Sequence, residues 1–341
     1  MTVNVSKPAI NVREKLAELD KPTGIAGEAM LRAETPQEQF NLIGAGRRNW
    51  LINGDFQVSQ RGAFTTASTY AANTYYVDRW KGGVSGSFTS QRNLNQTLPN
   101  GKITTSYRVT STGGAYAGIQ QWIEDYSVFS GQLATFSFWA KTNKAGCSAS
   151  FYTVANQFNV VSDIVADEQW HYYQATALVP TGGTAMRPEV WTGTGASSGD
   201  YLELAQVQLE LGKVATPFEH RSYGEELALC QRYFYRLNTA NAPYSITGVV
   251  GATDHIHTHW HPQEMRTSPT VENRTGTWSS YHVSTVGGGQ TGPTSTNVSS
   301  MTFESYSLGG RFYFTKQGTS GLICWVDITG SSGSVDFSAE L

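Results

Sequence analysis

Residues 201–236 read YLELAQVQLELGKVATPFEHRSYGEELALCQRYFYR and decide the fold, because they join a strand directly to a helix. Apolar residues lie two apart at the start of this stretch, and the alternation slips by one residue at Ala205 and Gln206. Alternation with a period of two predicts a half-buried strand over 201–211, and the slip predicts a β-bulge within it. Gly212 then predicts the end of the strand.

The second half of the stretch carries the signal for the start of a helix. Glu225 follows Ser222 by three residues, the spacing of a capping box, in which each side chain accepts a hydrogen bond from the other residue's backbone amide. We predict a helix from about Tyr223 to about Arg236 with one buried face. The apolar positions of that face are Leu227, Cys230 and Phe234.

The composition of the 341-residue chain favours an all-β fold. Charged residues make up 15% of it, against about 25% in average soluble proteins. Short apolar segments alternate with Gly, Asn and Ser turns, as in β-sandwiches. No repeat with a period of about 20–50 residues is visible, which counts against a β-helix or a propeller.

Charge, hydropathy and cysteine content exclude several classes of function. The net charge of −3 argues against sequence-independent binding of nucleic acid, which needs a basic face, so we expect none to bind; a local basic patch is the alternative, although no run of Lys and Arg exceeds two residues. No apolar run approaches the roughly 20 residues that span a bilayer, so we expect no membrane insertion. The N-terminus lacks the basic-then-apolar pattern of a secretory signal. The three cysteines, Cys147, Cys230 and Cys324, lie far apart, so neither a disulfide framework nor a zinc site is expected.

The length of the chain predicts more than one domain. We predict a mainly β protein with two jelly-roll-like β-sandwich domains, joined by a short helix and preceded by a small helical N-terminal anchor. The predicted parts are a helical arm at 1–46, a jelly-roll domain at 47–221, the connecting helix at 222–236 and a C-terminal β-sandwich at 237–341.

Several motifs in the chain carry a family resemblance. Residues 49–58 read NWLINGDFQV, which we predict to be a strand, and residues 78–80 read DRW, 136–141 read FSFWAK and 265–271 read MRTSPTV. Together with VQLE, ATPFE and EELALCQRY in the opening stretch, they resemble a module of tail-fibre and other virion-surface proteins of tailed bacteriophages. That module is itself similar to jelly-roll carbohydrate-binding modules, and the resemblance covers roughly residues 41–275.

The resemblance implies a function by contact without catalysis. It implies a structural component of a tailed phage virion, made in the host cytoplasm: a homotrimeric tail fibre or receptor-binding protein at the tail or baseplate, which binds a host-surface glycan. One alternative is a head fibre or capsid-decorating protein on the head surface. Another is a glycan depolymerase, for which the chain lacks an evident pair of catalytic carboxylates.

The N-terminal arm is the predicted contact with other virion structural proteins. Its apolar residues recur at helical spacing, and helices this short are marginal alone in water, so they need a partner. The residues predicted to make this attachment are Val12, Leu16, Leu19 and Phe40. The alternative is a tail without fixed structure.

Aromatic side chains are the predicted means of binding glycan. Sugars lay their apolar C–H faces on Trp and Tyr rings, while their hydroxyls bond to polar side chains. The residues closest to predicted loops are the candidates: Trp122, Tyr126 and Trp191. Trp80 and Trp139 lie inside the motifs, where a structural role is favoured over sugar binding, and packing in the core or an interface is the alternative for all of them.

Four histidines alternate along one predicted strand, at His255, His257, His259 and His261. Alternation places them on one face, and the family resemblance implies an axial metal that such pairs would bind in a trimer. The alternative is a strand whose histidines point to solvent or to a subunit interface. The same resemblance implies a structural calcium ion, with Asp55 and Glu203 as its candidate ligands.

Overall fold

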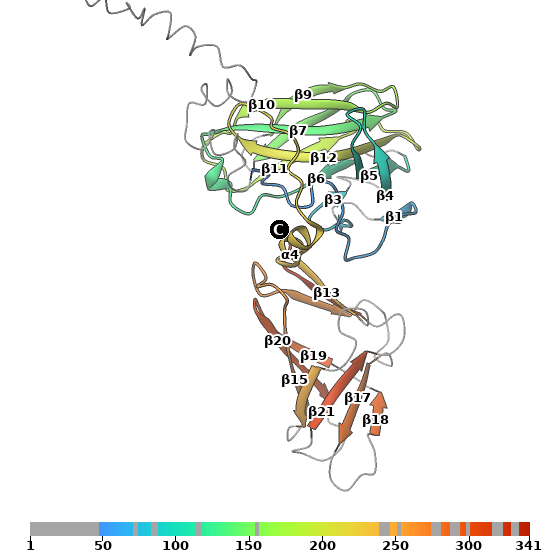
Figure 1. The fold of residues 1–341 in the computed structure, drawn as a ribbon, viewed down its shortest axis with the longest axis vertical. Coiled ribbons are helices and arrows are strands. Elements are labelled where there is room, and N and C mark those ends of the chain that lie inside the picture. The colour runs from blue at the N-terminus through green and yellow to red at the C-terminus, as the bar shows by residue number, and fades with distance from the viewer. Residues whose placement is uncertain are drawn as a thin grey trace, which may run out of the picture.

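The structure, a computed structural model, places two β-rich parts on either side of one helix (Figure 1). It describes residues 48–70, 74–82, 88–113, 117–153, 157–238, 246–250, 254–273, 281–286, 294–297, 301–315, 323–328 and 334–341. The predicted arm, with Val12, Leu16, Leu19 and Phe40, lies outside these residues. Within them, no helix has the length and apolarity required to cross a membrane.

The first part is a sandwich of two six-stranded antiparallel sheets. Sheet A has the order β1 (Ser68–Tyr70), β4 (Phe88–Thr97), β5 (Ile103–Ser111), β12 (Tyr201–Leu211), β7 (Leu133–Thr142) and β10 (His171–Leu178). Sheet B has the order β2 (Thr74–Tyr75), β3 (Lys81–Gly82), β6 (Gly118–Gln120), β11 (Met186–Trp191), β8 (Cys147–Thr153) and β9 (Gln157–Ile164). Side chains of both sheets form one core between them, including Trp80, Tyr107, Phe136, Phe138, Phe151 and Leu204.

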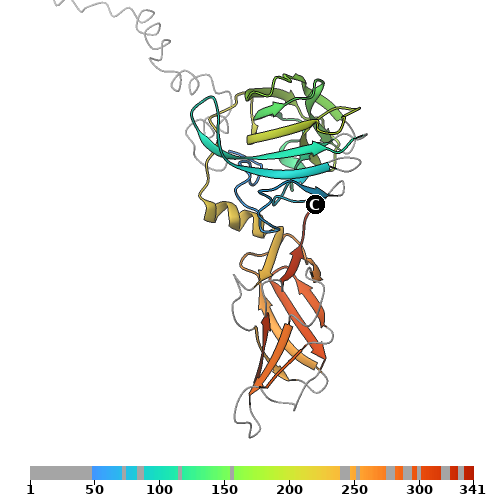
Figure 2. The ribbon, with the colours of Figure 1, turned by 90° about the vertical axis from the view of Figure 1, so that its right-hand side faces the viewer.

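The second part follows α4 (Tyr223–Gln231) and contains two further sheets (Figure 2). Three strands form the sheet nearer the helix: β13 (Phe234–Asn238), β22 (Ser334–Ser338) and β16 (Thr270–Asn273). The larger sheet has the order β18 (Thr294–Asn297), β17 (Tyr281–Val286), β21 (Ile323–Ile328), β14 (Ile246–Val250), β15 (Asp254–Trp260), β20 (Gly309–Thr315) and β19 (Met301–Tyr306). The predicted fold class, mainly β with sandwich domains joined by a short helix, is confirmed.

Strand β12 contains the predicted bulge. Its register against β7 shifts between Ala205 and Gln208, and Gln206 has a left-handed φ of 49°. The expectation of a half-buried strand was wrong, because every residue from Tyr201 to Glu210 is buried. β12 lies in the centre of sheet A, so one face meets the core while polar side chains of the neighbouring strands and the segment after β12 cover the other.

Helix α4 begins as predicted and ends early. Ser222 and Glu225 make both hydrogen bonds of the capping box. The helix stops at Gln231, five residues before the predicted end, and Phe234 belongs to β13, which pairs with β22. Phe234 has the spacing of a helical residue, but it forms part of a strand because it pairs with Ser338, about a hundred positions later in the chain.

The segment 49–58, predicted as a strand, forms no regular strand. It is an irregular buried loop held by side chains, and Asn53 binds it together at its centre. The Asn53 amide donates to the carbonyl oxygens of Val58 at 2.8 Å and Asp78 at 3.0 Å, and its oxygen accepts from the Val58 amide at 2.9 Å. These hydrogen bonds replace those that a sheet would supply, which is why the motif is buried without being a strand.

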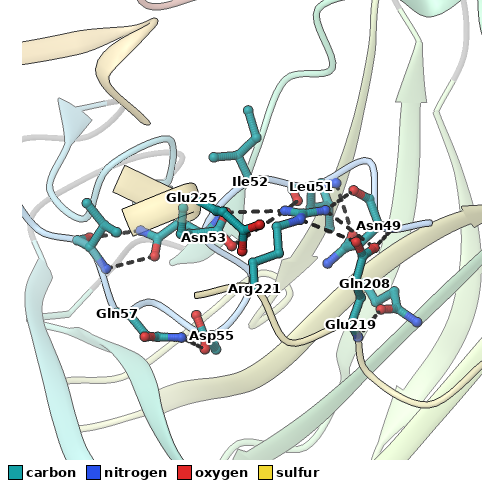
Figure 3. Close-up of polar contacts among 12 residues, drawn as sticks. Asn49, Leu51, Ile52, Asn53, Asp55, Gln57, Gln208, Glu219, Arg221 and Glu225 are labelled. Carbon is teal, nitrogen blue, oxygen red and sulfur yellow. Dashed lines mark hydrogen bonds and ion pairs between the residues drawn. The ribbon is translucent and has the colours of Figure 1, made fainter. Parts of the chain in front are cut away.

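The same loop is tied to the segment that precedes α4. Arg221 donates to the backbone oxygens of Asn49 and Leu51, and Glu219 accepts from the Asn49 amide (Figure 3). Arg221 also lies 3.3 Å from the carboxylate of Glu226 in α4. The ATPFE and EELALCQRY motifs therefore pack against the NWLINGDFQV motif, and their polar residues serve this contact.

Buried ion pairs join the sandwich to the second part. Glu340 lies 2.6 Å from Arg79 and 3.1 Å from Arg61, and the side chains of all three are at most 7% exposed. Arg61 also pairs with Asp78 at 3.1 Å. On the second part itself, Arg236 pairs with Asp336 across β13 and β22.

One histidine makes the stability of the second part sensitive to pH. His261 is 8% exposed, its ring lies 4.7 Å from that of Phe337 and 6.1 Å from that of Tyr235, and burial lowers its pKa to about 4. In the unfolded chain its pKa is about 6.5, so protonation favours unfolding. We expect this contribution to be fully present well above pH 6.5 and stability to fall by about 3 kcal/mol as the pH approaches 4.

This pH dependence is measured by urea unfolding at several pH values. His261→Phe should remove most of the loss between pH 6.5 and 4, whereas His171→Gln, which changes a half-exposed histidine of the first sandwich, should keep it. An equal pH dependence in both variants would contradict the assignment to His261.

Candidate functional site

A groove of about 530 Å³ lies on the outer face of sheet A, the face turned away from the core. Strands β7, β10 and β12 form its floor, and the segment after β12 and the turn before β5 form its rim. The described residues that line it are Asn100, Lys102, Ser137, Trp139, Tyr172, Gln174, Gln206, Ala215, Thr216, Pro217, Phe218 and His220.

Strand alternation explains why Trp139 faces the groove. Phe136 and Phe138 lie in the core, so Trp139, the next residue along β7, points to the opposite face. Tyr172 of β10 pairs directly with Trp139, and the two rings lie 5.4 Å apart at 53°. Tyr172 is 44% exposed, so the pair offers an aromatic surface to a ligand.

The bulge supplies the polar floor of the groove. Gln206 is only 5% exposed, lines the groove and has no hydrogen-bond partner for its buried Nε2. A buried donor without a partner costs about 1–3 kcal/mol, and the left-handed φ of Gln206 adds strain. A ligand oxygen that accepted this hydrogen bond would recover part of that cost.

The rim comes from two loops that are far apart in sequence. Phe218 and His220 extend from the connection between β12 and α4, with their rings 5.0 Å apart. Across the groove, Lys102 and Asn100 lie in the turn between β4 and β5, where the Asn100 side chain accepts from the Lys102 amide at 3.0 Å. Lys102 and His220 are both exposed, so the rim carries donors.

A buried carboxylate lies farther along the same face. Glu203 is fully buried and accepts from Arg108 at 2.6 and 2.9 Å, from Ser106 and from Asn93, with Lys141 at 3.5 Å. Burial by itself would raise the pKa of Glu203, but Arg108 and these hydrogen bonds lower it below its ordinary value. Glu203 is therefore an ionised structural partner of two cations.

The pair of candidate calcium ligands does not fit a calcium ion. Glu203 forms ion pairs with Arg108 and Lys141. Asp55 accepts a hydrogen bond from Gln57 and interacts electrostatically with His220. Among the described residues, no hydrogen-bond partner is common to the two carboxylates.

The three aromatic residues predicted to bind glycan lie elsewhere in the sandwich. Tyr126 belongs to the core, is 7% exposed and donates its hydroxyl to the Pro180 carbonyl, so its ring offers no face to a sugar. Trp122 is half-buried beside Tyr152, with Arg187 against both rings. Trp191 ends β11 of sheet B. None of the three lines the groove, and no arrangement among the described residues brings them together.

The histidine strand is described by its backbone. His255, His257 and His259 lie two apart on β15, and each pairs with a residue of β20. His261 lies one residue beyond the strand and is packed against Tyr235 and Phe337. Within the described side chains no group of three His, Cys, Asp or Glu residues is placed to hold a metal ion, and the axial metal stays a prediction.

Carboxylates outside the groove have structural partners. Glu124 accepts from Arg232 at 2.6 and 3.2 Å and from Tyr233, and Asp125 caps a short 3₁₀ turn. Asp200 accepts from the Ser197 amide at 2.7 Å. These contacts hold loops and the junction with the second part.

Sequence reasoning missed the groove residues, although a signal for two of them was present. The position of Trp139 inside a motif favours a structural role over sugar binding. The alternation of Phe136, Phe138 and Ala140 nevertheless placed it on the outer face, and the same alternation along β10 placed Tyr172 there. What the sequence did not contain is the pairing of β7 with β10, which puts the two rings side by side.

Comparison with known proteins gives likenesses at the level of solved structures. No model of a protein family and no curated protein matches the chain. The enzymatically active domain of bacteriophage CBA120 tailspike protein 4 is similar at 20% identity and a TM-score of 0.35, over 48% of this chain and 21% of that chain. The chain thus matches about a fifth of the length of that tailspike domain.

Two carbohydrate-binding structures are matched over nearly their whole length. TmCBM61, in complex with beta-1,4-galactotriose, is similar at 12% identity and a TM-score of 0.31, over 49% of this chain and 100% of that chain. The CBM22-1 xylan-binding domain of Paenibacillus barcinonensis Xyn10C is similar at 12% identity and a TM-score of 0.31, over 45% of this chain and 99% of that chain.

Proposed function

We propose that the chain is a non-catalytic glycan-binding protein and that the groove of sheet A is its saccharide site. The observation that carries this proposal is the pair of the half-buried Trp139 and the exposed Tyr172, which lines the groove together with Gln206 and its unpartnered amide nitrogen. Aromatic rings receive the apolar faces of a sugar, and a buried polar group fixes its hydroxyls. The groove's volume of about 530 Å³ falls within the range of about 300–1,000 Å³ of small-molecule sites.

The chemistry of the groove favours binding over hydrolysis. A glycosidase needs two carboxylates about 5–10 Å apart on opposed walls, and no described residue that lines the groove is acidic. Glu210, on the same strand as Gln206, is 1% exposed and accepts from the Thr216 amide, the Thr216 hydroxyl and Gln208. It supports the rim and does not reach a ligand.

Trp139→Ala tests the site directly. We expect it to lower the affinity for a bound bacterial surface polysaccharide at least about tenfold, because it removes the larger ring of the pair. Stability should change little, since the ring faces the groove. Binding is first found by screening immobilised polysaccharides and then quantified by calorimetry.

Trp122→Ala is the matched control, because Trp122 is a half-buried tryptophan of the same domain that does not line the groove. It should leave the affinity unchanged. The proposal would be overturned by full binding in Trp139→Ala, or by loss of binding in Trp122→Ala with Trp139→Ala unaffected. Release of new reducing ends from the polysaccharide would contradict the non-catalytic function and support a depolymerase.

We further propose that the protein lies on the surface of a tailed phage particle and binds glycan there. The motifs NWLINGDFQV, ATPFE and EELALCQRY support it through their resemblance to virion-surface proteins. A homotrimer attached through the N-terminal arm would gain avidity from several weak sites. Cryo-electron microscopy of particles labelled with antibody to the second β-rich part tests this: label at the tail or baseplate supports a tail fibre, and label on the head supports a head fibre.

A further inference from the structure

We propose that the groove selects an acidic saccharide and that Lys102 pairs with the carboxylate of the sugar. This inference rests on the proposed function of the groove and adds the class of its ligand. Two independent features of the lining carry it, the balance of charge and the balance of hydrogen-bond donors and acceptors.

The charge of the lining is positive. Lys102 is exposed at the rim and forms no ion pair with any described residue, and the His220 ring, exposed on the segment after β12, adds a further polar group. No carboxylate is found among the described lining residues. The chain as a whole carries a net charge of −3, so this groove differs in sign from the average surface.

The described carboxylates near the groove are bound inside the protein, and Glu219, between Phe218 and His220, accepts from the Asn49 amide and lies 3.5 Å from Arg221. Burial raises the pKa of Glu210, and its oxygens are occupied by Thr216 and Gln208. Burial also raises the pKa of Asp55, the carboxyl group near His220. Arg48 donates to the Thr216 hydroxyl at 3.1 Å and adds a positive charge near the rim.

Two hydrogen-bonding groups of the lining are available as donors. The Nε2 of Gln206 is buried without a partner, and the ammonium of Lys102 has three donors and no acceptor. Lys102 immediately precedes β5, the strand that pairs with β12, so both residues belong to the same end of the sheet. A ligand rich in acceptor oxygens matches this arrangement, and a sugar carboxylate supplies two of them together with the opposite charge.

The experiment compares acidic and neutral oligosaccharides of equal length on the full chain. Oligomers of galacturonic, mannuronic and glucuronic acid are matched with oligomers of galactose, mannose and glucose, and affinities are measured by calorimetry. We expect at least one acidic oligomer to bind more tightly than its neutral match and its affinity to fall severalfold between about 50 and 500 mM salt.

Lys102→Gln should weaken binding of the acidic oligomer about fivefold to tenfold and leave the neutral one unchanged. Lys102→Arg should restore most of the affinity, and Lys144→Gln, a lysine outside the groove, should have no effect. Equal losses for acidic and neutral oligomers in Lys102→Gln would overturn the inference. Binding of neutral oligomers alone, abolished by Trp139→Ala, would overturn it while preserving the proposed function, and binding of none would overturn both.

Discussion

Glu340→Ala is expected to lower the free energy of unfolding by about 3–5 kcal/mol, although it removes one carboxylate from the junction between the two parts. Arg79 is 1% exposed and has Glu340 at 2.6 Å as its ion-pair partner. Arg61 would keep Asp78, whereas the contacts of Arg79 with described residues would be reduced to the Trp122 carbonyl at 2.7 Å and the face of Tyr233. The large effect thus arises from a buried cation left without its counter-ion.

Urea unfolding followed by tryptophan fluorescence measures this effect. Glu264→Ala, which truncates an exposed glutamate of the second part, is the control and should change stability by less than about 0.5 kcal/mol. The double variant Arg79→Met with Glu340→Leu should recover much of the loss, because apolar side chains of similar volume can replace a buried ion pair. If Glu340→Ala were no more destabilising than Glu264→Ala, the junction would not depend on this ion pair.

Asn53→Ala is the second substitution with a large expected effect, about 4 kcal/mol. It leaves the Val58 amide and the carbonyls of Val58 and Asp78 without their partner inside the protein, and each buried unpaired group costs about 1–3 kcal/mol. Asn53 also has a φ of 60°, which asparagine tolerates better than alanine.

Asn95→Ala separates these two contributions. Asn95 has a nearly identical φ of 55°, but its side chain is exposed. Its replacement should cost about 1 kcal/mol or less, the share due to the backbone conformation. Equal losses in both variants, measured by denaturant unfolding, would show that strain and not the side-chain hydrogen bonds accounts for the effect of Asn53.

Local signals in the sequence were sufficient for elements whose stabilising contacts lie close by in the chain. The capping box depends on Ser222 and Glu225, three residues apart, and the bulge appears as a slip in alternation at Ala205 and Gln206. The mainly β class follows in the same way, because strand alternation and turn residues are properties of short segments. For these elements the local preference and the final fold agree.

Local signals failed where the partner is distant. The segment 49–58 has the composition of a strand, yet it makes only isolated backbone hydrogen bonds to β12 among the described residues, and several of its other hydrogen bonds go to side chains at 121, 219, 221 and 226. Helix α4 ends early because β13 pairs with β22, about a hundred residues later. Tyr126 is adjacent to a predicted loop, which suggests an accessible ring, yet neighbours that only folding brings to it hold that ring in the core.

By itself, the sequence determined the mainly β class, the start of α4, the bulge in β12 and a lack of any evident catalytic motif. Only the tertiary structure forms the groove proposed as the saccharide site, because it brings together Lys102 before β5, Trp139 on β7, Tyr172 on β10 and Gln206 on β12. The order of these strands in sheet A is set by pairing between segments up to about a hundred residues apart. A surface assembled by such pairing has no signature in any single stretch of the chain.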